Sequence, residues 1–79
     1  MKKQKDEAQF EDLLSKIGMK LKQMRIKKGY TSYEMFAWEN KLSRIQYWKM
    51  ERGTNCTLKS LSRVLEIHHL TIDQFFKDF

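Results

Sequence analysis

Apolar residues recur at intervals of three and four along the first third of the chain, between short polar stretches. The repeat begins near Asp6. Its apolar members are Phe10, Leu13, Leu14, Ile17, Leu21 and Met24. This spacing places them on one face of an α-helix, which we expect to run to about Lys28. Gly29 then supplies a stop signal, and Gly18 is expected to bend this helix or divide it in two.

Serine and threonine residues mark the starts of shorter helices in the rest of the chain. Such a residue caps the first free amides, and a Glu or Gln three positions later completes a capping box. The segments that fit are 31–34, 43–46 and 71–74, and Thr57 can start a helix on its own. The helices that we predict after the first lie at about 32–39, 44–51, 58–67 and 72–77. No strand is predicted, because no period-two alternation is present.

Composition fits a small helical domain. The 79 residues include no proline and only three glycines, which favours helices joined by short turns. A chain of this length buries one core, which we place in residues 10–79, after a basic tail at 1–9. No membrane-spanning run or signal segment is present, and the single Cys56 excludes an internal disulfide. We therefore expect a cytoplasmic protein.

The charge distribution makes a polyanion a candidate partner. The formal net charge is +6 and the sequence pI is near 9.6. Residues 1–29 carry nine Lys or Arg against four acids, residues 30–53 four against three, and residues 54–79 three of each. The positive charge is thus concentrated in the N-terminal third of the sequence, where it favours non-specific attraction to nucleic acid.

The helices predicted at 32–39 and 44–51 are separated by only four residues, 40–43. Two helices of about two turns joined by so short a turn must cross steeply, which is the geometry of a helix-turn-helix. The second helix of such a unit can enter the major groove of DNA, which is wide enough to admit a helix.

The same region and its flanks carry a more specific pattern. Within residues 29–53 its members are Phe36, Ala37, Leu42, Ser43, Arg44, Tyr47, Met50, Glu51, Arg52 and Gly53. Outside them it includes Ile17, Leu21, Met24, Arg25, Thr57, Leu58, Leu61, Val64, Leu65 and 70–76. This pattern resembles the phage repressor and Cro family of helix-turn-helix domains, the xenobiotic-response-element type. The resemblance implies an all-α, five-helix, lambda-repressor-like fold and a DNA-binding transcriptional regulator, with double-stranded DNA as the partner.

The chain departs from that family's pattern at three places. One extra residue precedes the second helix. The turn position that is glycine in relatives is Lys41, and a left-handed non-glycine residue costs roughly 1–2 kcal/mol. Either Lys41 takes this conformation, or the turn shifts so that Asn40 does. His68 stands where relatives have leucine, and His69 where they have glycine.

The resemblance also implies which residues contact DNA. Arg44 and Lys49 face outward from the third helix and can address guanine edges, the alternative being solvated or phosphate-bound side chains. Ile45 and Trp48 share that face and can contact thymine methyl groups. For Trp48, a shifted register that packs the ring inside is the alternative. Candidates for contact with the DNA backbone are Tyr33, Ser43, Arg52, Thr54 and Asn55; for Tyr33 the alternative is a surface tyrosine without a partner.

Two further sets have structural roles. Arg25 and Glu51 resemble the family's ion pair, which links the first helix to the end of the third. The C-terminal apolar residues exceed what a small core needs, so we expect a homodimer on paired half-sites. Its expected interface consists of Leu70, Ile72, Phe76 and Phe79. The alternative is that the last helix only closes the core.

No constellation typical of an enzyme, a cofactor site or a metal site is found. The adjacent His68 and His69 project to different faces, and Cys56 has no suitably spaced partners. We therefore expect a binding protein without cofactor or metal. The alternative function is an antitoxin-type interaction module, whose toxin partner would cover the N-terminal extension or the C-terminal apolar face.

Overall fold

The structure, a computed structural model, describes residues 5–77 and 79, which form five α-helices. The helices are α1 (Lys5–Lys27), α2 (Tyr33–Glu39), α3 (Arg44–Glu51), α4 (Leu58–Ile67) and α5 (Ile72–Phe76). No strand occurs among the described residues, so the all-α prediction is confirmed, and the shorter helices match their predicted bounds within one residue. None of the helices in this part of the chain combines the length and apolar character needed to cross a bilayer.

α1 begins within one residue of the predicted start and is not interrupted. It begins at Lys5, so residues 5–9 of the expected tail are helical, while residues 1–4 lie outside the described residues. Asp6 and Glu7 in the first turn favour this start, because they lie at the positive end of the helix dipole. The expected division of the helix at Gly18 is wrong, because the helix continues through this residue to Lys27.

Glycine at position 18 is explained by close packing of α1 against α3. Gly18 is buried, and a Cβ atom added to it would lie 2.8 Å from the carbonyl oxygen of Met50 and closer still to that of Glu51. Any side chain would therefore force the two helices apart. Beyond this crossing, Gly53 packs against the backbone of Ser15, with a positive φ of 85°.

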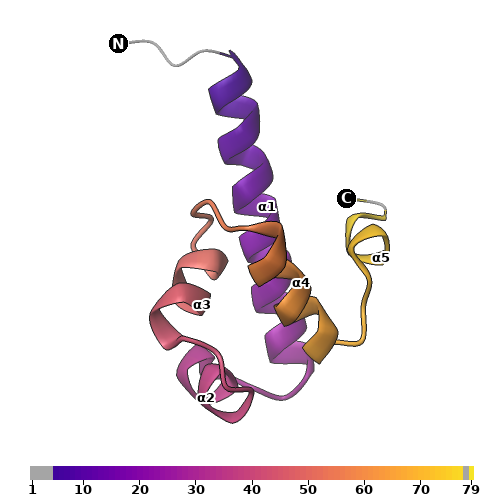
Figure 1. The fold of residues 1–79 in the computed structure, drawn as a ribbon. Helices are drawn as coiled ribbons and strands as arrows, with labels where there is room; N and C mark the ends of the chain where they lie inside the picture. The colour runs from indigo at the N-terminus through magenta and orange to yellow at the C-terminus, as the bar shows by residue number, and fades with distance from the viewer. Residues whose placement is uncertain (1–4, 78) are drawn as a thin grey trace.

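The hydrophobic core lies where the C-terminal half of α1 meets the other helices. Its buried apolar members are Ile17, Leu21, Phe36, Ala37, Tyr47, Met50, Leu61, Val64, Leu65 and Phe75. Aromatic rings fill its centre, with the Phe36 ring 5.2 Å from Tyr30 and 5.0 Å from Tyr47. The N-terminal half of α1 extends beyond the other helices (Figure 1), and Phe10 on it is 47% exposed.

The predicted caps of α4 and α5 are confirmed. The side-chain oxygen of Thr57 accepts a hydrogen bond from the Ser60 amide at the start of α4. Thr71 and Gln74 form a complete capping box, in which each side chain bonds the backbone of the other residue. These polar contacts satisfy amides that the first turn of a helix leaves free.

The capping box predicted at 31–34 does not form, and the one predicted at 43–46 forms only in part. α2 is capped by Ser32, whose hydroxyl accepts from the Met35 amide, and not by Thr31. Ser43 caps α3 as predicted, but the Gln46 side chain donates to Ser60 of α4 and does not return to the cap. In α3, a contact with α4 therefore replaces the bond from Gln46 back to the capping residue.

The turn between α2 and α3 keeps the register of the resemblance. Lys41 has the positive φ, at 57°, whereas Asn40 has a φ of −102°, so the turn is not shifted. Arg63 of α4 donates a hydrogen bond to the Lys41 carbonyl at 2.9 Å and supports this strained residue. His69 adopts the same conformation, with a φ of 59°, between α4 and α5.

Candidate nucleic-acid interface

α3 buries one face and exposes the other. Tyr47 and Met50 point into the core and are 1% and 3% exposed, which anchors the helix. The side chains on its exposed face are Arg44, Ile45, Trp48 and Lys49. Trp48 is 38% exposed, so the register in which its ring packs inside is excluded. Two cations and two apolar side chains therefore share one accessible surface of a two-turn helix.

The start of α2 lies beside this exposed face. Tyr33, the first residue of α2, is half-buried and borders a shallow hollow of about 390 Å³. The other residues lining the hollow are Glu34, Arg44, Ile45 and Trp48. The first turn of α2 and the exposed face of α3 thus form one continuous surface.

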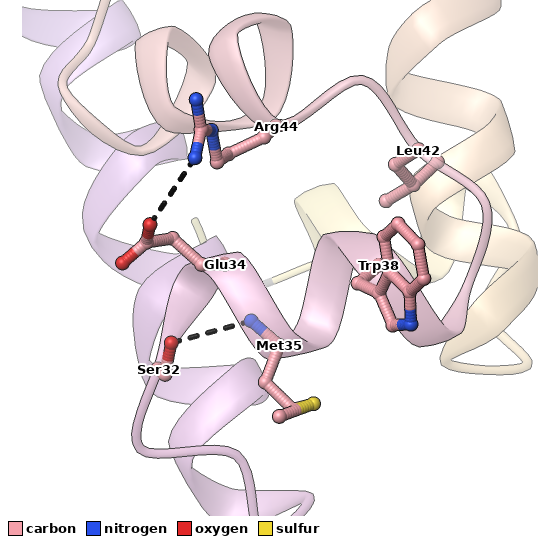
Figure 2. A pocket seen from close by; sticks show the side chains of 6 residues that line it. All are labelled: Ser32, Glu34, Met35, Trp38, Leu42 and Arg44. Carbon is pink, nitrogen blue, oxygen red and sulfur yellow. Dashed lines mark hydrogen bonds and ion pairs between the residues drawn. The ribbon is translucent and has the colours of Figure 1, made fainter.

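Arg44 pairs loosely with Glu34 across this surface. Its Nη1 lies 3.4 Å from Oε2 of Glu34, and the two side chains are 62% and 57% exposed (Figure 2). An exposed pair of this kind contributes about 0–1 kcal/mol, so Arg44 can exchange Glu34 for a stronger partner at little cost. The sequence did not reveal this pair, because the two residues lie ten positions apart on different helices.

Arg52 covers part of the Trp48 ring. Its guanidinium carbon lies 4.7 Å from the ring centroid, a cation–π contact at the C-terminal end of α3. Arg52 is itself exposed, so its charge remains accessible beside the ring. The sequence suggested both residues but not their contact, since residues four apart on a helix are neighbours only when their rotamers agree.

The other candidates for backbone contact lie at the two ends of α3. Ser43 is exposed at its N-terminus, where its hydroxyl accepts from the Gln46 amide at 3.3 Å. Thr54 lies beyond its C-terminus, and its hydroxyl donates to the Lys49 carbonyl at 2.7 Å. Asn55 is exposed in the loop that leads to α4. The side chains of Ser43, Thr54 and Asn55 are therefore all exposed near the ends of α3.

A second, more apolar surface adjoins Arg44. Met35, Trp38 and Leu42 line a groove of about 710 Å³ with Ser32, Glu34 and Arg44 (Figure 2). In Figure 2, Trp38 and Leu42 lie together on the side opposite to the ion pair. Trp38 is 81% exposed, and no sequence feature singled it out, because a helix of seven residues shows too little periodicity to assign its faces.

The predicted ion pair between Arg25 and Glu51 is present beneath the exposed surface. Arg25 is 4% exposed; its Nε and Nη2 lie 2.8 and 3.2 Å from the two carboxylate oxygens, and its Nη1 donates to the Tyr30 carbonyl at 2.7 Å. The hydrogen bond to Glu51 raises the pKa of Arg25, so the guanidinium stays charged. Burial, with Glu51 nearby, raises the pKa of Tyr47 far above its usual value, so that phenol stays neutral.

The residues expected at a dimer interface pack largely on their own chain. Leu70, Ile72 and Phe76 are half-buried against the core, and Phe79 is 37% exposed. The Phe76 and Phe79 rings lie 4.9 Å apart. Lys20 of α1 also lies over the Phe79 ring, at 5.6 Å. Helix α5 therefore closes the core, and a second copy could contact only the exposed parts of this set.

The two histidines and the cysteine differ in how far they are buried. His68 is half-buried and its ring stacks on Phe36 at 5.5 Å, whereas His69 is exposed. Burial, and then the charge of Lys28, lowers the pKa of His68. Burial raises the pKa of the Cys56 thiol. No group of three or more His, Cys, Asp or Glu that could hold a metal occurs within residues 5–77 or at residue 79.

Comparison of the chain with known protein families, with curated proteins and with solved structures finds no match. Its function must therefore be inferred from the chemistry and geometry of its own residues.

Proposed function

We propose that this chain is a sequence-specific, double-stranded-DNA-binding transcriptional regulator with a lambda-repressor-like helix-turn-helix fold. In this proposal α2 and α3 form the helix-turn-helix, and α3 lies in the major groove. The observation that carries the proposal is the exposed face of α3, which presents Arg44, Ile45, Trp48 and Lys49 while the opposite face is anchored in the core. The major groove of DNA displays both hydrogen-bonding base edges and methyl groups, which matches a helix face that carries both cations and apolar side chains.

The roles of the residues follow from their positions. Arg44 would donate to O6 and N7 of a guanine, and Lys49 would approach a neighbouring base edge or phosphate. The residues proposed to contact the DNA backbone are Tyr33, Ser43, Arg52, Thr54 and Asn55. Tyr33 borders the exposed face from the start of α2, and the others lie at the two ends of α3, where backbone contacts would fix its register in the groove.

A homodimer completes this proposal. Regulators that use a helix-turn-helix bind two half-sites about one helical turn apart, which a two-fold symmetric dimer matches. The proposed contact surface is the exposed part of Leu70, Ile72, Phe76 and Phe79. The protein would act by binding, without cofactor or catalysis.

The experiment that tests DNA binding is selection of bound duplexes from a random pool, followed by titration at several salt concentrations. We expect enrichment of one sequence with paired half-sites, and a salt dependence that corresponds to roughly 6–10 phosphate contacts per dimer. Lys22→Ala, which removes an exposed charge from α1, serves as the control for loss of net charge alone. Equal affinity for all duplexes, or none at low salt, would contradict the proposal.

A second candidate function is that of an antitoxin whose main partner is a toxin protein. It is favoured by the exposed apolar side chains outside the proposed DNA-binding face, above all Trp38 and Met35, which are 81% and 50% exposed. Apolar surface of this kind often marks a protein-binding site. Co-expression with the products of adjacent genes tests it: a partner should co-purify with the chain but not with Trp38→Ala. Purification of the chain alone would rule this candidate out.

A further inference from the structure

The N-terminal part of α1 carries an apolar face that the other described helices leave partly uncovered. Residues 5–14, which we call the arm, extend beyond the rest of the fold (Figure 1). Phe10 and Leu13 on the arm are 47% and 38% exposed, and Leu14 is half-buried. The spacing of these residues continues into the core at Ile17, which is 7% exposed. The arm therefore has the pattern of a buried helix face at a position where its own chain does not bury it.

Such a face is suited to packing against another helix. Most of the stability of a helix in a protein comes from packing of its apolar face, and neighbouring apolar side chains left in water are typical of an interaction site. The residues of α5 proposed for the dimer are largely buried on their own chain and offer little free surface. The arm supplies the apolar surface that α5 lacks.

The charges along the arm make a second copy of this chain the partner that fits it. Asp6 and Glu7 lie in the first turn of α1, whereas Lys16 lies just beyond the other end of the arm. Opposite charges therefore meet at both ends when two arms run antiparallel, and like charges meet when they run parallel. Lys16 is available for this contact, because its pair with Asp12 is 3.5 Å long and the two side chains are 59% and 68% exposed.

We propose that the arm is a dimerisation element, which packs antiparallel against the arm of a second copy with Phe10 against Phe10. This inference rests on the homodimer of the proposed function and gives it a contact surface outside α5. A pairing centred on Phe10 places Asp6 of one copy opposite Leu14 of the other. Asp6 then lies about 3 Å along the helix axis from Lys16 of that second copy, within reach of its ammonium group.

The base of the arm adjoins the surface of α5 already proposed for the dimer. A hollow of about 350 Å³ at this place is lined by Lys16, Met19, Lys20, Gln23 and Phe79. In the antiparallel pairing, position 5 of one copy lies opposite position 15 of the other, so the tip of each arm reaches the edge of this hollow on the second copy. The arm and the exposed part of Phe79 thus form one continuous interface.

The first test measures self-association of the full chain by sedimentation equilibrium in the absence of DNA. Phe10→Ala should weaken the dimer by roughly tenfold to a hundredfold, because one half-exposed ring is lost from each copy. Ile26→Ala is the matched control, since Ile26 is 49% exposed and lies on the opposite side of α1. This control should keep the affinity of the natural chain, and circular dichroism checks that both variants remain folded.

A charge exchange tests the direction of the pairing. Asp6→Lys and Lys16→Asp should each weaken the dimer at low salt, and the double variant should recover most of the loss. The two residues meet only when the arms run antiparallel, because in a parallel pair they lie about 15 Å apart along the axis. Recovery in the double variant therefore supports direct contact between them.

Four outcomes would overturn the proposal. The chain could be monomeric at every concentration, Phe10→Ala could behave as Ile26→Ala does, or the double charge variant could fail to recover. The chain could also be a monomer whose arm binds a different protein. A monomer that still selects a DNA duplex would refute the arm contact and leave DNA binding intact. A dimer with the expected properties that selects no duplex would refute DNA binding and leave the arm contact intact.

Discussion

The chain contains two arginine–glutamate pairs with the same chemistry and different surroundings. In the pair of Arg25 and Glu51 the side chains are 5% and 9% exposed, and two N–O distances of 2.8 and 3.2 Å join them. In the pair of Arg44 and Glu34 the side chains are 62% and 57% exposed, with one contact at 3.4 Å. Residue type is therefore constant between the two pairs, and burial is what differs.

This difference separates a structural pair from an available one. Arg25 and Glu51 have lost their hydration, so removal of one member leaves the other charged and buried. The pair also links α1 to the end of α3, which holds α3 at a fixed position. Arg44 and Glu34 keep their hydration, and their attraction is weak at high dielectric. The buried pair can thus present α3 while the exposed pair releases its arginine to a ligand.

The largest expected effect comes from breaking the buried pair. Arg25→Ala should lower the free energy of unfolding by about 3–5 kcal/mol, because the Glu51 carboxylate is left buried without its partner. Urea denaturation followed by circular dichroism measures this loss. Arg44→Ala is the matched control and should change stability by less than about 1 kcal/mol. Equal effects of the two substitutions would show that burial does not distinguish the pairs.

Gly18→Ala tests the same junction through its backbone. The new Cβ would meet the carbonyl oxygens of Met50 and Glu51, which should cost roughly 1–3 kcal/mol of stability by overpacking. Helix propensity alone predicts the opposite sign, since alanine favours a helix by about 1 kcal/mol over glycine. The sign of the change in melting temperature therefore decides between the two effects, and a stabilised variant would contradict the close approach of α1 and α3.

Arg44→Ala sharpens the comparison on the side of binding. We expect it to remove about 1–3 kcal/mol of discrimination at one base pair and to leave the other positions of the site unchanged. Competition among duplexes that carry each of the four base pairs at every position measures this. If all sequences weakened equally, Arg44 would contact phosphate, and its role in base recognition would be lost.

The two adjacent histidines repeat the contrast between buried and exposed groups. Burial, followed by the charges of Lys28 and His69, lowers the pKa of His68, so the folded chain binds fewer protons there than the unfolded chain does. Stability should therefore fall as the pH drops below the ordinary value of 6.5, and it should level off below the lowered pKa. Urea titrations between pH 7.5 and about pH 5 measure this, and His68→Leu should flatten the dependence.

His69→Asn is the control for this titration. His69 is exposed and has a positive φ of 59°, a conformation that asparagine accepts. This variant should keep the pH dependence of the natural chain. If the pH dependence were lost in His69→Asn and kept in His68→Leu, His69 and not His68 would be its source.

The smallest expected effect belongs to Glu34→Gln. Stability should change by no more than about 1 kcal/mol, because the pair is exposed. Affinity for DNA should rise slightly, since Arg44 no longer has a competing carboxylate and one negative charge near the phosphates is gone. Dissociation constants at two salt concentrations test this. A weaker affinity would show that Glu34 positions Arg44 for its base.

Local signals in the sequence were sufficient for most of the secondary structure. The caps at Ser43, Thr57 and Thr71 determine where α3, α4 and α5 begin, because free amides at a helix start need acceptors close by in the chain. The outward orientation of Arg44 and Lys49 and the pairing of Arg25 with Glu51 were expected from the family resemblance. Periodicity alone could not have assigned these faces, since α3 has too many apolar positions for one stripe.

Contacts between distant residues were the part that sequence could not predict. Gly18 reads as a helix breaker, and only the position of α3 shows that it allows two backbones to approach. The partners of Arg44 and Arg52 also depend on which rotamers two helices permit.

The turn before α3 shows how its angle can be maintained without the glycine that such a turn favours. Lys41 takes a left-handed conformation, and the only support described for its carbonyl comes from Arg63, 22 positions away on α4. The orientation of α3 thus depends on a neighbour across the fold as well as on the four residues that join it to α2. A segment of α4 that lies far along the chain therefore helps to set the direction in which α3 leaves the turn.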